Sequence, residues 1–327
     1  MAAARSFNVL FVAPTDVSGA VLASGLLKKL HDEAPDPAFT IVATGKVAPL
    51  YADMPKVERI IIADKERSGR RWYGLFGGLR ARRWSLVVDM PAGLVTGRLR
   101  PKGKPLRRED GEPAHKLIEA AQLMRLEDEP PAPYLFVSDA TAASAARLTA
   151  GDAPILAVAP AAEWLGKAWP PERFAEVVRR LLARGGAMAG GRLMIIGERD
   201  ELHEIEPVRA AAPRDMTIDL VGRADLLTAF AALKGARLFI GNDTGYSQFA
   251  AAAGAPTLAL FGPSDDRIWR PWGADVKVVR GARTLEEIRR IDAALSAQVR
   301  HMVDLSTDSV MAAAETLLED TATAARG

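Results

Sequence analysis

Polar side chains and glycines gather where two apolar strands of the C-terminal half end. The strand Leu238–Ile240 runs into the turn Gly241–Gly245, and the next strand, Thr257–Phe261, ends in Gly262–Ser264. The first turn leads into a helix expected at Phe249–Ala253, whose N-terminus offers unpaired amides and the positive end of the helix dipole. Such turns suit a phosphate, and ligands of open parallel sheets bind outside the carboxyl ends of the strands. The pattern favours a nucleotide-sugar site.

Four residues near these strand ends have the chemistry to hold a diphosphate. The Thr244 hydroxyl and the neighbouring backbone amides can donate to phosphate beside Asp243, and Gly245 permits close approach of the ligand. Lys167 follows the strand Ile155–Ala159, and its amine can act on the same ligand as a point charge. The alternatives are a helix N-cap at Asp243 and Thr244, and a surface lysine that flanks a helix.

The order of the predicted elements is that of two α/β halves. In the first half, strands are expected at Asn8–Ala13, Phe39–Ala43, Arg59–Ile62 and Leu86–Asp89, with helices at Ala20–Leu30, Gly74–Arg83 and Glu112–Leu126. In the second half, strands are expected at Ile155–Ala159, Arg192–Ile196, Thr217–Leu220, Leu238–Ile240, Thr257–Phe261 and Val276–Val279. Strands that alternate with helices in this way build parallel sheets.

A turn-rich stretch near residue 150 predicts the boundary between two domains. A chain of 327 residues is too long for one comfortable core. We expect one α/β domain over residues 1–150 and a second over residues 151–305, with a small-molecule site in the cleft between them. A closing helix at about residues 306–319 is expected to pack back on the first domain.

The composition excludes several classes of site. The chain has no cysteine, which rules out disulfides, zinc-thiolate centres and cysteine nucleophiles. No histidine pair has the spacing of a metal site, and we expect neither a metal nor a cofactor. No apolar run approaches the roughly 20 residues that span a bilayer. We therefore expect a cytoplasmic protein.

Basic residues are concentrated in the segment Lys65–Arg108. It contains thirteen lysines and arginines against two acidic residues, although the net charge of the whole chain is only +2. Such a segment predicts an anionic partner, namely a glycan, a phosphorylated lipid or the inner face of the cytoplasmic membrane. The alternative is a solvated basic surface. Aromatic residues are too sparse here for a single-strand stacking platform, and we expect no nucleic-acid partner.

Three motifs of the C-terminal half resemble those of the heptosyltransferase family, glycosyltransferase family nine. The first is Lys167–Phe174, which follows the pattern K-x-W-P-x-x-R-F, and the second is Gly222–Leu226. The third begins with Asn242–Gly245 and continues through Phe261–Ser264 to Pro271–Gly273. The resemblance in order and spacing covers about residues 155 to 273, and it is looser in the N-terminal half.

The resemblance implies a GT-B fold, in which two Rossmann-like, doubly wound domains face each other across a cleft. It implies that the first domain binds the acceptor and the second binds a nucleotide-diphosphate sugar. The expected reaction is an inverting transfer of a sugar, usually heptose from ADP-heptose, to a lipopolysaccharide-core-like or other anionic glycan acceptor. The oligomeric state is open, with a monomer favoured.

The resemblance also implies roles for individual residues. Lys167 and Thr244 would stabilise the departing diphosphate as catalytic and donor-binding groups. Glu201, after the strand Arg192–Ile196, would accept hydrogen bonds from the ribose hydroxyls, although an exposed carboxylate at a helix start is an equal alternative.

The loop after the first strand departs from the family pattern. The family has Gly-Asp before the sequence that matches Ala20–Leu22, and this chain has Ser18 and Gly19 there. The family's aspartate is the proposed base that deprotonates the acceptor hydroxyl. Asp16, three positions before Gly19, could supply this base, and the alternative is a turn residue.

A second departure lies at Gln248, where the family pattern D-T-G-x-x-H has histidine. Glutamine keeps a hydrogen bond but cannot carry a proton near neutral pH. The departures at Gly19 and Gln248 leave one alternative function open, a catalytically impaired nucleotide-sugar-binding protein of the same fold. A dinucleotide oxidoreductase is disfavoured because no strand is followed by G-x-G-x-x-G.

Overall fold

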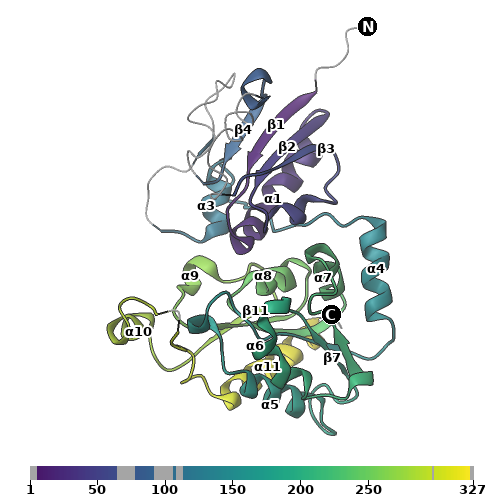
Figure 1. The fold of residues 1–327 in the computed structure, drawn as a ribbon, viewed down its shortest axis with the longest axis vertical. Coiled ribbons are helices and arrows are strands. Elements are labelled where there is room, and N and C mark those ends of the chain that lie inside the picture. Colours follow the sequence, from purple (N-terminus) through teal and green to yellow (C-terminus); the bar gives the residue numbers. More distant parts are fainter. Residues whose placement is uncertain (1–5, 65–77, 92–105, 108–112, 297, 325–327) are drawn as a thin grey trace. The chain divides into compact units, whose positions relative to one another are not determined.

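The computed structural model describes residues 6–64, 78–91, 106–107, 113–296 and 298–324 of the chain. The chain forms two compact units, Met1–Ser138 and Asp139–Gly327, and each unit is built around its own β-sheet (Figure 1). All strand pairs in both sheets are parallel. The predicted α/β class with two parallel sheets is confirmed.

The sheet of the first unit has the order β3-β2-β1-β4-β5. Its strands are β1 (Phe7–Val12), β2 (Pro37–Ala43), β3 (Val57–Ile62), β4 (Leu86–Asp89) and β5 (Leu106–Arg107), and its helices include α1 (Val17–Glu33), η1 (Ala48–Tyr51) and α3 (Lys116–Gln122). The central strand β1 is an apolar run whose residues Val9–Phe11 are completely buried, as a parallel sheet requires. The strand order reverses between β1 and β4, which puts their carboxyl ends at the switch point where ligands of such sheets bind.

The sheet of the second unit has the order β11-β10-β9-β6-β7-β8. Its strands are β6 (Ile155–Ala159), β7 (Arg192–Ile195), β8 (Thr217–Asp219), β9 (Ala236–Asn242), β10 (Thr257–Phe261) and β11 (Val276–Arg280). Its helices include α4 (Asp139–Thr149), η3 (Leu165–Lys167), α5 (Pro171–Leu182), η4 (Arg199–Glu201), α6 (Leu202–Arg209), η5 (Arg214–Met216), α7 (Leu226–Leu233), α8 (Gly245–Ala252), α9 (Asp266–Trp269), α10 (Leu285–Ile291) and α11 (Thr307–Ala324). The order reverses between β6 and β9, so the turns after these two strands flank the switch point.

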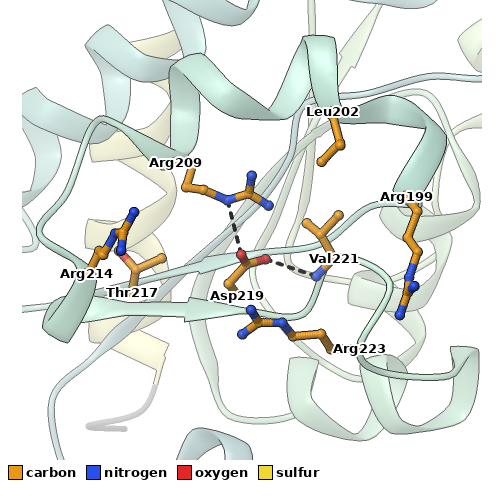
Figure 2. A pocket seen from close by; sticks show the side chains of 8 residues that line it. All are labelled: Arg199, Leu202, Arg209, Arg214, Thr217, Asp219, Val221 and Arg223. Atoms are coloured by element: carbon orange, nitrogen blue, oxygen red, sulfur yellow. Dashed lines mark hydrogen bonds and ion pairs between the residues drawn. The ribbon is translucent and has the colours of Figure 1, made fainter.

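The edge strand β8 ends at Asp219, whose carboxylate accepts hydrogen bonds from two neighbouring residues (Figure 2). One carboxylate oxygen accepts a hydrogen bond from the amide of Val221, and the other accepts one from Nε of Arg209, both at 3.1 Å. Because Arg209 closes α6, these contacts join the end of that helix to the edge of the sheet.

Two helices, α4 and α11, pack within the second unit, whereas the sequence pattern assigned them to the first domain. α4 packs on α7, so the two units divide at Ser138, before the boundary at residue 150 that the turn-rich stretch suggests. α11 was expected to pack on the first domain, and it packs instead on α5 and on strands β9, β10 and β11 of the second. Its residues Val310, Ala314 and Leu317 recur at helical spacing and complete the apolar core of that unit. None of the helices in the described ranges is both long and apolar enough to span a bilayer.

Two helix boundaries also differ from the prediction, each for a local reason. α8 begins at Gly245 rather than at Phe249, because Thr244 has the extended backbone of an N-cap and the chain turns into the helix directly after it. α3 ends at Gln122 rather than at Leu126. Arg125 has a φ of +57°, a left-handed conformation in which the helix cannot continue.

Candidate functional site

The side chain of Asn242 fastens the carboxyl ends of β6 and β9 to each other. Asn242 is the last residue of β9 and is completely buried. Its Oδ1 accepts a hydrogen bond from the amide of Trp169 at 3.0 Å, and its Nδ2 donates to the carbonyls of Pro160 and Ala161 at 2.7 and 3.3 Å. Asn242 therefore holds the loop of residues 160–170 in place. The sequence pattern predicted a ligand turn here but did not identify this role, for which the only signal was a polar residue ending a buried strand.

Asn242→Ala should destabilise the protein by about 3 kcal/mol, because it leaves a buried amide and a buried carbonyl without partners. Urea unfolding of the variant measures this loss. Asn8→Ala is the matched control, since the Asn8 side chain is only partly buried, with its amide donating to the carbonyl of Arg83 at 3.2 Å and its oxygen accepting from Arg82, and the variant should cost only about 1 kcal/mol. Equal losses in the two variants would contradict the assigned role.

Lys167 and Asp243 form an ion pair beside this amide. Lys167 Nζ lies 2.9 Å from Asp243 Oδ2, and the Asp243 side chain is only 3% exposed while that of Lys167 is 24% exposed. The same amine lies 3.4 Å from the Asp243 carbonyl oxygen. The buried carboxylate thus directs a partly exposed ammonium group to the switch point of the second sheet. Asp243 acts here on Lys167, and direct contact of Asp243 with a ligand stays a prediction.

The first turn of α8 presents a hydroxyl that lacks a partner. Thr244 is the N-cap of α8, yet its side chain makes no capping bond, and its buried Oγ1 has no hydrogen-bond partner among the described residues. Gly245 is the first residue of the helix, and the Ser247 hydroxyl donates to the carbonyl of Asn242 at 2.6 Å. A buried polar group without a partner costs free energy and calls for a ligand or water oxygen. Together with the helix amides and Lys167, this hydroxyl forms a candidate anion site, called the anion site below, and its ligand stays a prediction.

Gln248 connects α8 to α9. Its Nε2 donates to the carbonyl of Trp269, the last residue of α9, at 2.8 Å, and the side chain is 2% exposed. Its Oε1 is buried and has no partner in the described part of the chain. Since the amide nitrogen is held by a carbonyl, the free atom is an acceptor, which cannot donate to a phosphate.

The loop after β7 carries three carboxylates, Glu198, Asp200 and Glu201, and is joined to α8. Glu201 Oε2 accepts a hydrogen bond from the Glu198 amide at 2.7 Å, and the Tyr246 hydroxyl donates to Glu198 Oε1 at 2.8 Å. Burial raises the pKa of Glu201, and the neighbouring Glu198 charge adds to this effect. Burial, with the Glu198 carboxylate beside it, also raises the pKa of Tyr246, so the phenol keeps its proton and donates it. The Tyr246 bridge brings this loop to the same end of the sheet as the anion site.

Glu201→Gln should stabilise the protein at pH 7, and the difference should disappear as the pH falls to about 4. The raised pKa means that the folded state favours protonated Glu201, so its contribution to stability is present below the unfolded pKa and is lost as the pH rises through the folded pKa. Glutamine keeps the acceptor for the Glu198 amide and removes the charge. Thermal unfolding at both pH values measures the change. Destabilisation of the variant at pH 7 would contradict it.

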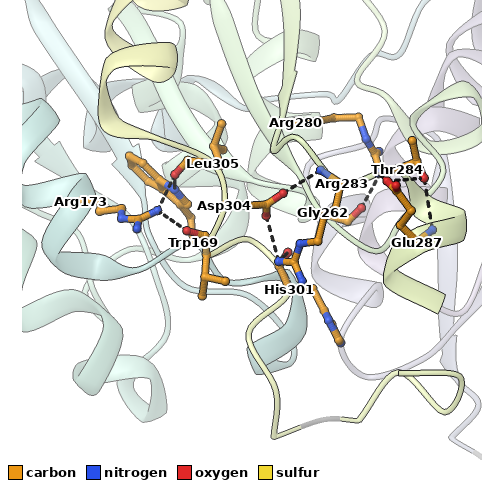
Figure 3. A network of polar contacts seen from close by, with 11 residues as sticks. Trp169, Arg173, Gly262, Arg280, Arg283, Thr284, Glu287, His301, Asp304 and Leu305 are labelled. Atoms are coloured by element: carbon orange, nitrogen blue, oxygen red, sulfur yellow. Dashed lines mark hydrogen bonds and ion pairs between the residues drawn. The ribbon is translucent and has the colours of Figure 1, made fainter. Parts of the chain in front are cut away.

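The motif residues Trp169 and Arg173 fix the loop that carries Lys167. Figure 3 shows both side chains meeting the carbonyl oxygen of Leu305, to which Trp169 Nε1 and an Arg173 nitrogen donate at 2.9 and 2.5 Å. On the other side, Asp304 accepts from the guanidinium of Arg283 at 2.9 Å. The segment before α11 is thus held from both sides, which explains why tryptophan and arginine occur at these positions of the motif.

Asp16 lies at the carboxyl end of β1 in the first unit. It is the exposed N-cap of α1, and its Oδ1 accepts a hydrogen bond from the Gly19 amide at 2.7 Å. A Cβ atom at Gly19 would lie 3.1 and 3.2 Å from the two carboxylate oxygens of Asp16. The Asp16 carboxylate therefore occupies the space that a side chain at position 19 would enter. The sequence pattern allows a turn residue as the alternative role of Asp16; in the structure Asp16 caps α1 and stays exposed to solvent.

Six of the predicted site residues come together at one end of the second sheet, and Asp16 belongs to the other unit. The six are Lys167, Glu201, Asp243, Thr244, Gly245 and Gln248. Most of the basic segment Lys65–Arg108 lies outside the described residues; within them Arg82 forms an ion pair with Glu58 at 2.5 Å. Among the residues described, no group of three or more acidic or histidine side chains is placed to hold a metal ion.

Comparisons with known proteins show which family the chain resembles. Residues 112–296 match the family model of glycosyltransferase family 9 (heptosyltransferase). The lipooligosaccharide heptosyltransferase 2 of Haemophilus influenzae is 24% identical over 312 residues, which are 84% of this chain and 88% of that protein.

Two solved structures share the fold. The Escherichia coli ADP-heptose lipopolysaccharide heptosyltransferase II has a TM-score of 0.73 at 20% identity, over 96% of this chain and 99% of that one. The family 9 glycosyltransferase of Veillonella parvula has a TM-score of 0.76 at 19% identity, over 96% and 97%. The predicted GT-B fold class is thereby confirmed. With its family match spanning more than half of the sequence, the chain belongs to glycosyltransferase family 9, the heptosyltransferases.

Proposed function

We propose that this chain is an inverting heptosyltransferase that moves heptose from ADP-heptose to an anionic, lipopolysaccharide-core-like acceptor. The observation that carries the proposal is the anion site at the switch point of the second sheet, where the Lys167 ammonium, the unpartnered Thr244 hydroxyl and the first amides of α8 lie together. The family and the names of the relatives, one of which specifies ADP-heptose, support the donor.

The diphosphate is the group that this site would stabilise. As the bond between the anomeric carbon and the diphosphate oxygen breaks, its electron pair and a growing negative charge move onto the leaving ADP. A fixed ammonium, a hydroxyl and helix amides stabilise that charge without reorganising during the reaction. Asp243 contributes by holding Lys167 in position, since its carboxylate is almost fully buried against the amine.

The nucleoside would be held by the loop after β7. Tyr246 occupies one oxygen of Glu198. One oxygen of Glu201 is bound to the Glu198 amide, and the carboxylate has further lone pairs for ribose hydroxyls. The raised pKa of Glu201 agrees with a site role, because groups perturbed by burial concentrate at functional sites.

Asp16 would be the base that removes the proton from the acceptor hydroxyl as its oxygen attacks the anomeric carbon. The family pattern places an aspartate at position 19, where this chain has glycine. The Asp16 carboxylate lies in contact with the point where that side chain would begin, since its oxygens are 3.1 and 3.2 Å from a Cβ built on Gly19. It is also exposed at the carboxyl end of β1, beside the switch point of the first sheet.

The acceptor would bind to the first unit, with the basic segment Lys65–Arg108 matching its negative charge. The same segment would attract the enzyme to an anionic membrane surface. Gln248 would contact the donor only by accepting a hydrogen bond at its free Oε1, since its Nε2 is held by the carbonyl of Trp269 and an amide does not titrate near neutral pH. We favour an active enzyme over the impaired binding protein, since the relatives are named for heptosyl or glycosyl transfer.

Thermal stabilisation by nucleotides tests the donor assignment. ADP, UDP, GDP and NAD are compared at equal concentration, and we expect ADP to raise the melting temperature most. Binding to the folded state alone stabilises it by about 2.7 kcal/mol when the ligand is present at 100 times its dissociation constant. Equal or absent shifts with all four compounds would refute the proposed donor.

A further inference from the structure

A cavity lined by four arginines lies in the C-terminal unit, and none of the anion-site residues lines it. It has a volume of about 550 Å³ and is bounded by the loop after β7, by α6 and by the edge strand β8 with its flanking turns (Figure 2). A volume of this order is typical of small-molecule sites. Neither Lys167, Glu201, Asp243 nor Thr244 lines it.

The lining is dominated by guanidinium groups. Arg199, Arg209, Arg214 and Arg223 line the cavity, and Asp219 is the acidic residue among its lining side chains. Figure 2 shows Arg214 and Arg199 toward opposite ends, with Arg209 and Arg223 on either side of Asp219. Like charges gathered around one concave surface repel one another, and an anionic ligand relieves that repulsion.

Two of the four arginines are already positioned by the protein. Arg209 Nε donates to Asp219 at 3.1 Å, and another nitrogen of Arg209 pairs with Glu206. Arg199 donates to the carbonyl of Gly222 through two nitrogens, at 3.1 and 2.9 Å. These contacts use only part of each group's five N–H donors, so both guanidiniums keep donors for a ligand.

The side chains of the other two arginines have no partner among the described residues. Arg214 and Arg223 are exposed and make no side-chain hydrogen bond or ion pair with the part of the chain that the structure describes. A guanidinium presents a planar fork that matches the oxygens of phosphate, whereas a lone surface lysine offers only a point charge. The arrangement therefore combines two fixed donors with two that are free to close on a ligand.

We propose that this cavity binds a small ligand that carries two or more phosphate groups, at a site separate from the proposed donor site. Its four cations exceed Asp219 and the Glu206 carboxylate that pairs with Arg209, so a multiply charged anion fits better than a single one. Arg199 lies in the same loop as Glu201, but the other lining residues belong to α6, to the edge strand β8 and to the turns beside it, whereas the anion site lies after β6 and β9.

Calorimetric titration of the full chain with pyrophosphate tests the proposal. We expect Arg214→Gln/Arg223→Gln to weaken pyrophosphate binding at least about tenfold, since each lost charged hydrogen bond is worth about that factor. Arg184→Gln is the matched control, because Arg184 is an exposed arginine of the same unit outside the cavity, and it should leave the affinity unchanged. Affinity should also fall with rising salt.

A third variant separates this site from the donor site. Lys167→Ala/Asp243→Asn removes both partners of the buried ion pair, which leaves no unpaired charge, and should keep pyrophosphate binding in the cavity. Binding that is lost in this variant but kept in Arg214→Gln/Arg223→Gln would overturn the proposal and place pyrophosphate at the anion site. Equal weakening by Arg184→Gln, or no binding to the unmodified chain, would also overturn it. Equal melting-temperature shifts with ADP, UDP, GDP and NAD would refute the proposed donor, and they would not affect the result of the pyrophosphate titration.

Discussion

Lys167→Ala should lower kcat/KM for sugar transfer by about 10²- to 10³-fold and abolish stabilisation by ADP. The Lys167 amine is the cation that the Asp243 carboxylate holds at the switch point of the second sheet, 2.9 Å away. Removing a fixed donor to the growing charge of a leaving group costs a factor of this size. Steady-state kinetics with a nucleotide-sugar donor, together with nucleotide-dependent melting curves, measure both losses.

The same variant leaves the Asp243 carboxylate buried without its partner, which should cost about 2 kcal/mol of stability. Lys167→Ala/Asp243→Asn should recover much of this stability without recovering activity, which separates the loss of chemistry from unfolding. Lys277→Ala is the matched control, since Lys277 pairs with Asp320 at 3.3 Å on an exposed surface and should change neither property. Transfer at the original rate by Lys167→Ala would refute the role of Lys167.

Asp16→Asn should lower kcat by about 10²- to 10⁴-fold while ADP stabilisation and melting temperature stay unchanged. General base catalysis contributes a factor of this order, and an amide cannot accept the proton. Asparagine caps helices as well as aspartate does, so the hydrogen bond from the Gly19 amide to position 16 is kept. Single-turnover transfer and melting curves give the two readouts.

Asp225→Asn is the matched control for this change. Asp225 caps α7 in the same way, accepting from the Thr228 amide at 2.7 Å, and it should retain full transfer activity. If Asp16→Asn transferred sugar at the unaltered rate, Asp16 would be only a helix cap. The base would then have to be another group of the first unit.

Local patterns in the sequence were sufficient to locate the strands of the C-terminal half. Strands β6 and β10 lie at the residues that the apolar runs predict, because a strand buried on both faces must be apolar throughout. The small and polar residues after β9 likewise predict a ligand turn, and this role stays a prediction. The N-terminal half was less predictable, and part of it lies outside the described residues.

The alternation of strands and helices and the motifs from Lys167 to Gly273 together determined the α/β class and the family, and they predict a ligand at the carboxyl end of the second sheet. Only the tertiary structure decided that Asp243 holds Lys167, that Asn242 fastens the loop before α5, that α11 completes the second unit, and that four arginines line one cavity. Each of these depends on contacts between residues far apart in the sequence. Periodicity and helix propensity act over one or two turns, so they carry no information about which distant side chains will meet.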